Sequence, residues 1–372
     1  MKKSLVIFII ILSVCLFSFG VYVGVYEISS FNDLNSLTNI IQKNPTSLQD
    51  HKAIEKFDFN TIIDIQSQSD IFQKRTDVVN YIWNDNELPN VLPTSIENNI
   101  SDDRFDDLNN LKQIDKFLIE MEHGVISNVY LFIPENNNNN LILYHQGHSD
   151  GFILGKSTID FFLKNGFSVA AFSMPLIGMN NNPTITLESL GPIKFIEHGQ
   201  FELLETENFS PMSYFFTPIT SSINYLEKNY EYDYIHMIGI SGGGWTTTIY
   251  SGLDTRISNS FAVSGSLPLS LRFIHEDIGD YEQLNSQLYK IANYPEFYLM
   301  SSFGDDRKFT QIFNKFDPCC FAGTLYTQYE DSIKQKINEL GEGSFVIFLD
   351  ESHKKHEISE LSRNFILENL NN

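Results

Sequence analysis

A serine between glycines at the end of an apolar run is the feature of this chain with the clearest chemistry. The segment YIHMIGISGGGWTTTIYSG, residues 234–252, sets Ser241 between Gly239 and Gly243. A serine hydroxyl is a weak nucleophile, so a sharp turn from a strand into a helix is needed to present its oxygen to a base. The glycines permit that turn, and the start of a helix favours nearby negative charge. The pattern predicts a nucleophile elbow in which Ser241 attacks a carbonyl carbon.

Two histidines near the C-terminus are the candidates for the base that Ser241 needs. They are His353 and His356, in the segment DESHKKHEIS between an apolar run and the last expected helix. An imidazole titrates near neutral pH and can therefore accept the proton of a serine hydroxyl. A carboxylate is needed to orient such an imidazole. The candidate carboxylates are Asp305, Asp306 and Asp317.

The elements expected to position these residues alternate between strands and helices. Short apolar runs typical of strands buried on both faces occur at 141–145, 167–175, 234–241, 260–268, 297–303 and 346–350. Helical patterns occur at 152–165, 215–229, 329–340 and 358–370, and a hairpin is expected at 116–134. This alternation predicts an α/β fold with a mostly parallel central sheet and helices on both faces.

From about residue 116 to the C-terminus, the chain resembles the α/β-hydrolase superfamily. The residues that carry the resemblance are the elbow, the loop YHQGHSDG at 144–151 and the C-terminal histidines. There is a looser likeness to esterases of the dienelactone-hydrolase and acetyl-xylan-esterase kind, and to prolyl-oligopeptidase-like domains. The resemblance implies the α/β-hydrolase fold, a triad in the chain order Ser, acid, His, and an oxyanion hole shared by two loops.

The resemblance also assigns roles to the candidate residues. It favours His356 over His353 as the base, because the superfamily sets its histidine next to the start of the last helix. It implies an acid from the loop after the preceding strand, which was expected at 297–303. The choice of acid stays open between Asp306 and Asp317, with Asp305 next.

The two oxyanion donors implied by the resemblance are backbone N–H groups. The first belongs to Gly242, directly after the nucleophile. The second lies in YHQGHSDG, which looks like the superfamily's His-Gly loop with Gln146 inserted between His145 and Gly147. Because the donor in such loops commonly follows the glycine, we expect the N–H of His148 in this role.

A metal hydrolase is an alternative that the histidine spacing raises. His145 with His148, and His353 with His356, form two HxxH pairs, and imidazole is a good zinc ligand. Neither pair has the HExxH spacing or a helical setting, and a metal-activated water would make the elbow serine superfluous. We therefore expect neither a catalytic metal nor a cofactor.

The function expected from these residues is hydrolysis of a small-molecule carboxylic ester, or a related acyl bond, through an acyl-enzyme. A serine peptidase of the prolyl-oligopeptidase type is one alternative, less favoured because no propeller-like repeat accompanies the domain in this sequence. A non-catalytic, membrane-displayed binding module is the other alternative. The stretches 176–212 and 270–295 are expected to form a lid and the substrate pockets.

The charge of the chain argues against nucleic-acid partners, and its cysteine content argues against a disulfide framework. The chain has 25 Lys+Arg and 47 Asp+Glu, a formal net charge of −22. A surface this acidic repels phosphate backbones, so no nucleic-acid partner is expected. Cys319 and Cys320 are neighbours in sequence, and adjacent cysteines rarely reach bridge geometry, so we expect two small thiols there.

The N-terminal segment, residues 1–27, is expected to be a membrane anchor or signal segment. Lys2 and Lys3 precede 22 uncharged residues from Leu5 to Tyr26, long enough for about 33 Å of helix against a hydrocarbon core of about 30 Å. An uncleaved transmembrane helix is favoured, with the lysines in the cytoplasm and the catalytic domain outside it. The expected order of domains is this anchor, a polar stalk or accessory region at 28–110, and the hydrolase domain at 111–372.

Overall fold

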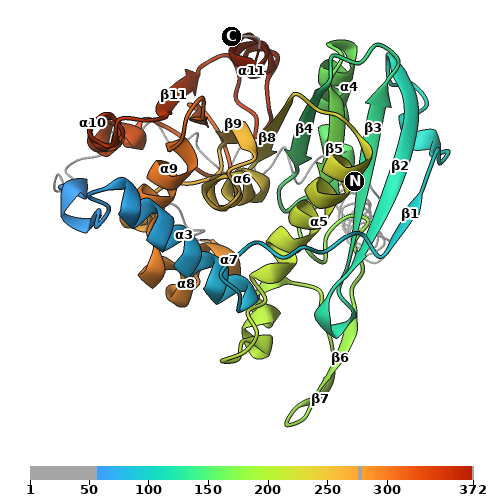
Figure 1. Cartoon of the computed structure of the whole chain (residues 1–372), viewed down its shortest axis with the longest axis horizontal. Helices are drawn as coiled ribbons and strands as arrows, with labels where there is room; N and C mark the ends of the chain where they lie inside the picture. Colours follow the sequence, from blue (N-terminus) through green and yellow to red (C-terminus); the bar gives the residue numbers. More distant parts are fainter. Residues whose placement is uncertain (1–56, 275–278, 371–372) are drawn as a thin grey trace, which may run out of the picture. The chain divides into compact units, whose positions relative to one another are not determined.

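The computed structural model describes residues 57–274 and 279–370, which belong to one compact unit (Figure 1). The expected anchor at 1–27 and the stalk as far as residue 56 lie outside the described residues. No helix in the described part of the chain is long and apolar enough to cross a membrane.

A nine-stranded sheet forms the centre of this unit, in the order β1-β2-β3-β5-β4-β8-β9-β10-β11. Strands β4, β5, β8, β9, β10 and β11 run parallel, while β1, β2 and β3 form an antiparallel extension that joins at β5. The predicted hairpin is β2–β3, and the mostly parallel sheet predicted from the alternation of elements is confirmed. The strands are β1 (Ser95–Glu97), β2 (Leu111–Glu120), β3 (Ile126–Pro134), β4 (Asn140–His145), β5 (Ser168–Phe172), β8 (Tyr234–Ile240), β9 (Ile257–Val263), β10 (Lys308–Asn314) and β11 (Ser344–Asp350). A separate hairpin pairs β6 (Thr184–Leu187) with β7 (Gly191–Lys194).

Helices cover both faces of the sheet, as the alternation of side chains along β8 shows. Ile238 and Ile240 belong to a buried cluster that also contains residues of α4 and α11. Gly239, which points to the other face, lies against the start of α6. The longer helices are α3 (Gln68–Trp83), α4 (Lys156–Lys164), α5 (Ser213–Asn229), α6 (Gly242–Leu253), α9 (Tyr294–Ser302), α10 (Glu330–Leu340) and α11 (Glu360–Leu370). The shorter ones are α7 (Tyr281–Leu284), α8 (Ser286–Ile291) and the 3-10 turns η1 (Phe59–Ile62), η2 (Asp103–Phe105), η3 (Glu122–Gly124), η4 (Gly151–Gly155), η5 (His198–Leu204), η6 (Leu269–Ile274) and η7 (Leu325–Gln328).

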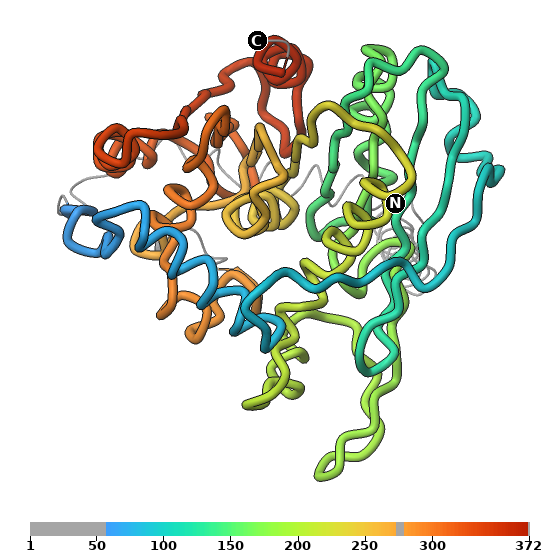
Figure 2. Tube along the Cα trace, in the orientation of Figure 1, coloured from blue at the N-terminus to red at the C-terminus, as the bar shows by residue number. Residues whose placement is uncertain are grey.

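Helix α3 shows that residues 57–110 are part of the same packed unit as the sheet. Its Ile71 is fully buried, and Figure 2 shows the helix, in blue, beside the orange segment that contains α8. Lys74 Nζ lies 3.0 Å from Glu296 Oε1, and Arg75 Nε donates a 2.8 Å hydrogen bond to the carbonyl oxygen of Gly252. The domain boundary expected at 110/111 is therefore not a boundary in the structure, because an apolar helix face upstream of it completes the core.

One predicted strand, residues 297–303, is helical as far as Ser302. It forms most of α9, where every side chain is buried. A helix that is apolar on all sides shows no 3.6-residue period, so a short apolar run cannot be assigned from its pattern alone. The helix start carries a capping box between Asn293 and Glu296, with Pro295 in the first turn. The strand in this part of the sheet is β10, which follows α9.

The register of the parallel strands brings four strand ends to one edge of the sheet. Parallel strands point their carboxyl ends the same way, so the loops that follow β4, β8, β10 and β11 gather there. These are the loops that carry the candidate site residues. The aligned pairs are His145 with Gly239, Ile240 with Val263, Val263 with Ile312, and Asn314 with Asp350.

Candidate active site

Ser241 lies at the turn between β8 and α6 in a strained backbone conformation. Its φ is 58° and its ψ is −125°, angles that an L-residue rarely adopts and that cost about 1–3 kcal/mol. The surrounding backbone holds it there. The N–H of Ser241 donates to the carbonyl oxygen of Val263 at 2.9 Å, and the N–H of Trp245 donates to the carbonyl oxygen of Ser241 at 2.9 Å. This is the geometry that an elbow requires, and the role of Ser241 as nucleophile stays a prediction.

Close backbone contacts explain the glycines around the serine. A Cβ atom at Gly239 would lie 2.0 Å from the carbonyl oxygen of Gly243. A Cβ atom at Gly243 would lie 2.0 Å from the carbonyl oxygen of His145. Any side chain at these positions would push α6 away from the ends of β8 and β4.

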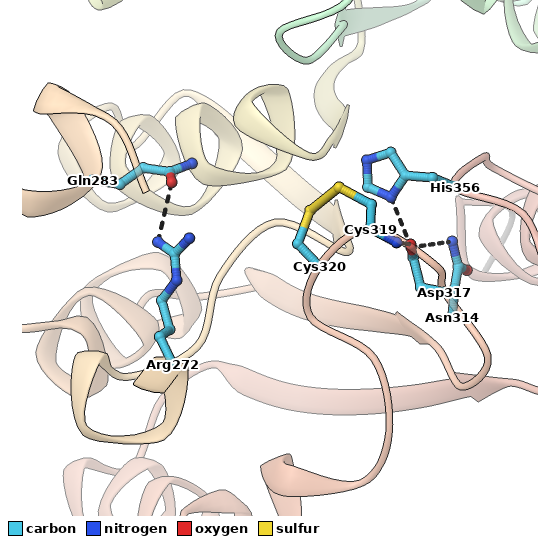
Figure 3. Close-up of a disulfide and its surroundings, with 7 residues drawn as sticks. All are labelled: Arg272, Gln283, Asn314, Asp317, Cys319, Cys320 and His356. Carbon is cyan, nitrogen blue, oxygen red and sulfur yellow. Dashed lines mark hydrogen bonds and ion pairs between the residues drawn. A yellow bond between two sulfur atoms is a disulfide. The ribbon is translucent and has the colours of Figure 1, made fainter. Parts of the chain in front are cut away.

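The strongest polar contact between predicted site residues joins His356 to Asp317. The distance from His356 Nδ1 to Asp317 Oδ2 is 2.7 Å (Figure 3). A carboxylate only accepts, so the ring proton is on Nδ1 and the lone pair is on Nε2. The Nε2 atom is buried and has no hydrogen-bond partner in the described part of the chain. The imidazole is thus oriented as a base whose accepting nitrogen is available for a proton.

Asp317 is itself fixed by two neighbours at the end of β10. Its Oδ1 accepts a 2.9 Å hydrogen bond from the N–H of Cys319. Its Oδ2 accepts a long one, 3.5 Å, from Asn314 Nδ2, which also donates to the carbonyl oxygen of Glu357 at 2.9 Å. Asn314 therefore ties the carboxylate loop to the loop that carries His356, as Figure 3 shows for Asn314, Asp317 and His356.

The other candidate acids and the other candidate base lie apart from this pair. Asp305 and Asp306 are exposed and precede β10, whereas Asp317 follows it. They were expected at the carboxyl end of a strand, and that expectation is wrong, because the run before them is helix α9. His353 Nε2 lies 3.6 Å from Asp350 Oδ2. The Asp350 carboxylate also accepts hydrogen bonds from two serines of the following loop and from one serine of α11.

A disulfide between Cys319 and Cys320 lies beside the His356–Asp317 pair (Figure 3). The expectation of two free thiols is wrong. Its basis was that neighbouring cysteines rarely reach bridge geometry, but the turn after Asp317 brings the two sulfur atoms together. Both sulfur atoms lie within 4.8 Å of a ring nitrogen of His356. The bridge therefore lies directly beside the imidazole of His356.

The loop after β4 reaches the elbow through Gly147 and His148. A Cβ atom at Gly147 would lie 2.6 Å from Ser241 Cβ and 3.1 Å from Ser241 Oγ. A Cβ atom at Gly242 would lie 2.4 Å from Cε1 of His148, so this imidazole rests directly on the first residue of α6. The structure thus brings Gly242 and His148, the two residues expected to supply oxyanion donors, into contact beside Ser241.

Comparison with known proteins adds evidence on the fold. No family model matches the chain, and no curated protein matches its sequence. Among solved structures, it is similar to acetyl xylan esterase 1 from Thermoanaerobacterium sp. JW/SL YS485, with 14% identity over 80% of this chain and 92% of that chain and a TM-score of 0.54. It is also similar to an acetyl xylan esterase from Paenibacillus sp. R4, with 15% identity, coverage of 85% and 99%, and a TM-score of 0.56. The chain has the α/β-hydrolase fold. At such low identity the likeness concerns the fold.

A pocket of about 320 Å³ lies next to His356 in this α/β-hydrolase fold. Its wall also includes Ile240, directly before Ser241, so it lies between the end of β8 and the loop that carries the histidine. Tyr144 and Gln146 contribute a polar side, and their side chains are hydrogen-bonded to each other. Within the described residues, the wall contains nothing from 176–212 or 270–295, the stretches expected to form the pockets.

A second polar cluster beside the elbow was not predicted as a unit. His148 Nε2 lies 2.9 Å from Glu282 Oε1, and His198 Nδ1 lies 3.0 Å from Glu282 Oε2. Burial alone would raise the pKa of Glu282, but the two imidazoles, His198 foremost, hold the pKa of this carboxyl below its ordinary range. Residues this far apart in sequence form no spacing pattern. The HxxH pairing also gave no hint, since His145 hydrogen-bonds its neighbour Gln146.

The contact between Gly147 and Ser241 gives a testable prediction for Gly147→Ala. The added methyl group would meet the serine side chain, and displacement of a reacting group by about 1 Å costs about 10²-fold in rate. We expect turnover of a p-nitrophenyl ester to fall by at least about 10²-fold, with an unchanged circular dichroism spectrum. Gly199→Ala is the matched control, because no heavy atom lies within 4 Å of the added carbon. Full activity of Gly147→Ala would mean that this loop does not border the reacting serine.

Proposed function

We propose that the chain is a serine hydrolase that cleaves carboxylic esters through an acyl-enzyme. The observation that carries the proposal is the 2.7 Å contact between His356 Nδ1 and Asp317 Oδ2, with a buried Nε2 that has no other described partner. A strained serine at a strand-to-helix turn on the same sheet edge supports it. The fold shared with known esterases agrees with this reading.

The proposed reaction has two steps. His356 Nε2 takes the proton of Ser241 as its oxygen attacks the carbonyl carbon, and then gives that proton to the departing alcohol. Water, activated by the same nitrogen, cleaves the acyl-enzyme and frees the serine. The N–H groups of Gly242 and His148 hold the oxyanion in both steps. Asp317 stays ionised and stabilises the imidazolium.

Small esters with short acyl groups are the substrate class we propose to test first. Both acetyl xylan esterases compared above act on acetyl groups by name, and the pocket beside His356 holds about 320 Å³. That volume is at the lower end of the range for small-molecule sites. The acidic chain also disfavours anionic substrates.

The test is hydrolysis of p-nitrophenyl acetate and butyrate by the full-length protein in detergent, with labelling by a fluorophosphonate probe. We expect turnover with both esters and a single labelled residue, Ser241, located by mass spectrometry. Cleavage of a proline-containing peptide with no ester turnover would favour the peptidase alternative. No turnover and no label would leave a non-catalytic binding module.

We also propose that residues 1–27 anchor the chain in a membrane with the catalytic domain outside the cytoplasm. The 22 uncharged residues after Lys2 and Lys3 support this. The full chain is expected in the membrane fraction after an alkaline wash, and protease added outside intact cells should remove the domain. Release of the protein by the wash would contradict the anchor.

A further inference from the structure

Four side chains from three distant segments meet beside α6. His148 comes from the loop after β4, His198 from η5, and Asp280 and Glu282 from the segment around α7. His148 Nε2 lies 2.9 Å from Glu282 Oε1 and 3.1 Å from Asp280 Oδ2. One nitrogen or oxygen atom from each of the four lies within 4.8 Å of all the others.

The hydrogen bonding of His198 leaves a lone pair directed at this cluster. Its Nε2 lies 2.9 Å from the carbonyl oxygen of Pro175, which can only accept, so Nε2 carries a proton. In the neutral ring, Nδ1 then has a lone pair, yet it faces Glu282 Oε2 at 3.0 Å. Two acceptors at this distance need a shared proton or a metal ion between them. A backbone carbonyl that fixes the outer nitrogen of a histidine is a common arrangement around metal ligands.

The contacts can be satisfied by one extra proton on His198, with neutral His148 donating through Nε2, or by one divalent metal ion. One proton leaves the two carboxylates with a net negative charge, whereas a divalent ion neutralises both. A proton on each imidazole would also neutralise both, but it would set two imidazolium ions against each other, because the ring centroids of His148 and His198 are 5.1 Å apart. Like charges at this distance repel, the more so because His198 and Glu282 are buried. A single ion leaves both rings neutral.

The donor set and its spacing match zinc. Imidazole nitrogen and carboxylate oxygen are zinc ligands with bonds of about 2.0–2.2 Å, and a tetrahedral ion holds its ligand atoms about 3.3 Å apart. Three facing contacts lie at 2.9–3.1 Å, and one atom from each of the four residues lies within 4.8 Å of the others, so an ion would move the closest pairs slightly apart and draw the wider pairs together. We propose that His148, His198, Asp280 and Glu282 form a binding site for one zinc ion.

The position of this site indicates a structural role. The ion joins three segments that are otherwise connected by long stretches of chain, and it fixes the imidazole of His148 where it lies against Gly242. Only the idea that it steadies an oxyanion donor rests on the proposed function. Binding of zinc at the four residues does not.

The test is equilibrium dialysis of full-length, chelator-treated protein against Zn²⁺, with metal content measured by mass spectrometry. We expect one ion per chain and a Tm raised by roughly 5 °C at saturation. Loss of a ligand in His198→Asn or Asp280→Ala is expected to weaken binding by at least about 100-fold, more than outer-shell changes typically do. His123→Asn is the control, because its ring bonds Tyr214 outside the cluster.

Asp280 keeps the test decisive if the buried His198 variant fails to fold, since the side chain of Asp280 is 53% exposed. Absence of zinc from the wild type, or equal affinity in Asp280→Ala, would overturn the proposal. Ester turnover is recorded separately. Zinc binding without turnover would contradict the proposed function and leave the metal site standing.

Discussion

Replacing Ser241 with alanine is expected to lower p-nitrophenyl acetate turnover by at least about 10³-fold while the protein stays folded. The proposed mechanism passes through a covalent bond to Ser241 Oγ, and no other group in it can form that bond. The substitution also keeps a Cβ at the strained position, so backbone strain changes little. Stability measured by thermal unfolding should therefore remain near that of the wild type.

A second serine at the same sheet edge provides the control for this result. Ser264 follows β9 as Ser241 follows β8, also has a positive φ, and its hydroxyl is buried without a described partner. Ser264→Ala should therefore keep ester turnover near that of the wild type and should still be labelled by fluorophosphonate at Ser241. Equal activity of Ser241→Ala and wild type would remove the acyl-enzyme mechanism altogether.

The parts of the fold that follow from local pattern could be predicted from the sequence. Strand β8 is a continuous apolar run that ends in glycines, and the contacts of Gly239 and Gly243 leave no room for a side chain. The signals for the turn and for the buried strand thus both lie within one short segment of the sequence. The same holds for α10, whose end at Gly341 with a φ of 86° is readable as a helix stop.

Elements that are buried on every side could not be assigned as helix or strand from their sequence pattern. Helix α9 and strand β8 are both mostly apolar and buried on every side, so the period of their side chains alone does not separate a helix from a strand. Because α9 was predicted as a strand, Asp306 was expected after a strand, whereas it precedes β10. The capping box from Asn293 to Glu296 was the available signal. Likewise α3 has a polar average composition, and only its packing on α6, α8 and α9 shows that it belongs to the domain.

Contacts between distant segments carry the least sequence signal. Glu282 is fully buried between His148 and His198, but the three residues come from separate connections whose lengths set no pattern. A buried charge without a partner is costly, so Glu282 needs the two imidazoles beside it. These partners are in place only after the three loops have packed together. The fold therefore determines this site, whereas the elbow is already determined by its own segment.

Asp317→Asn is expected to lower ester turnover by about 10³- to 10⁴-fold, because an amide in place of the carboxylate no longer stabilises the imidazolium and favours the wrong ring tautomer. The carboxylate accepts from His356 Nδ1 at 2.7 Å, so the loss falls directly on the proposed base. The expected signature is a fall in kcat with little change in KM. If Asp317 were needed only for folding, its substitution would lower the amount of active protein. The kcat per molecule labelled by fluorophosphonate would then be unchanged.

Asp306→Asn is the matched control for this prediction, since the two residues were equal candidates in the sequence and differ by position in the structure. Asp306 is exposed and lies before the start of β10, whereas Asp317 lies after its end. Its substitution should leave turnover within about 2-fold of the wild type, as for surface changes in general. If Asp306→Asn is inactive and Asp317→Asn is active, the acid comes from the other end of the strand. The His356–Asp317 contact would then belong to the structure of the loop and not to the reaction.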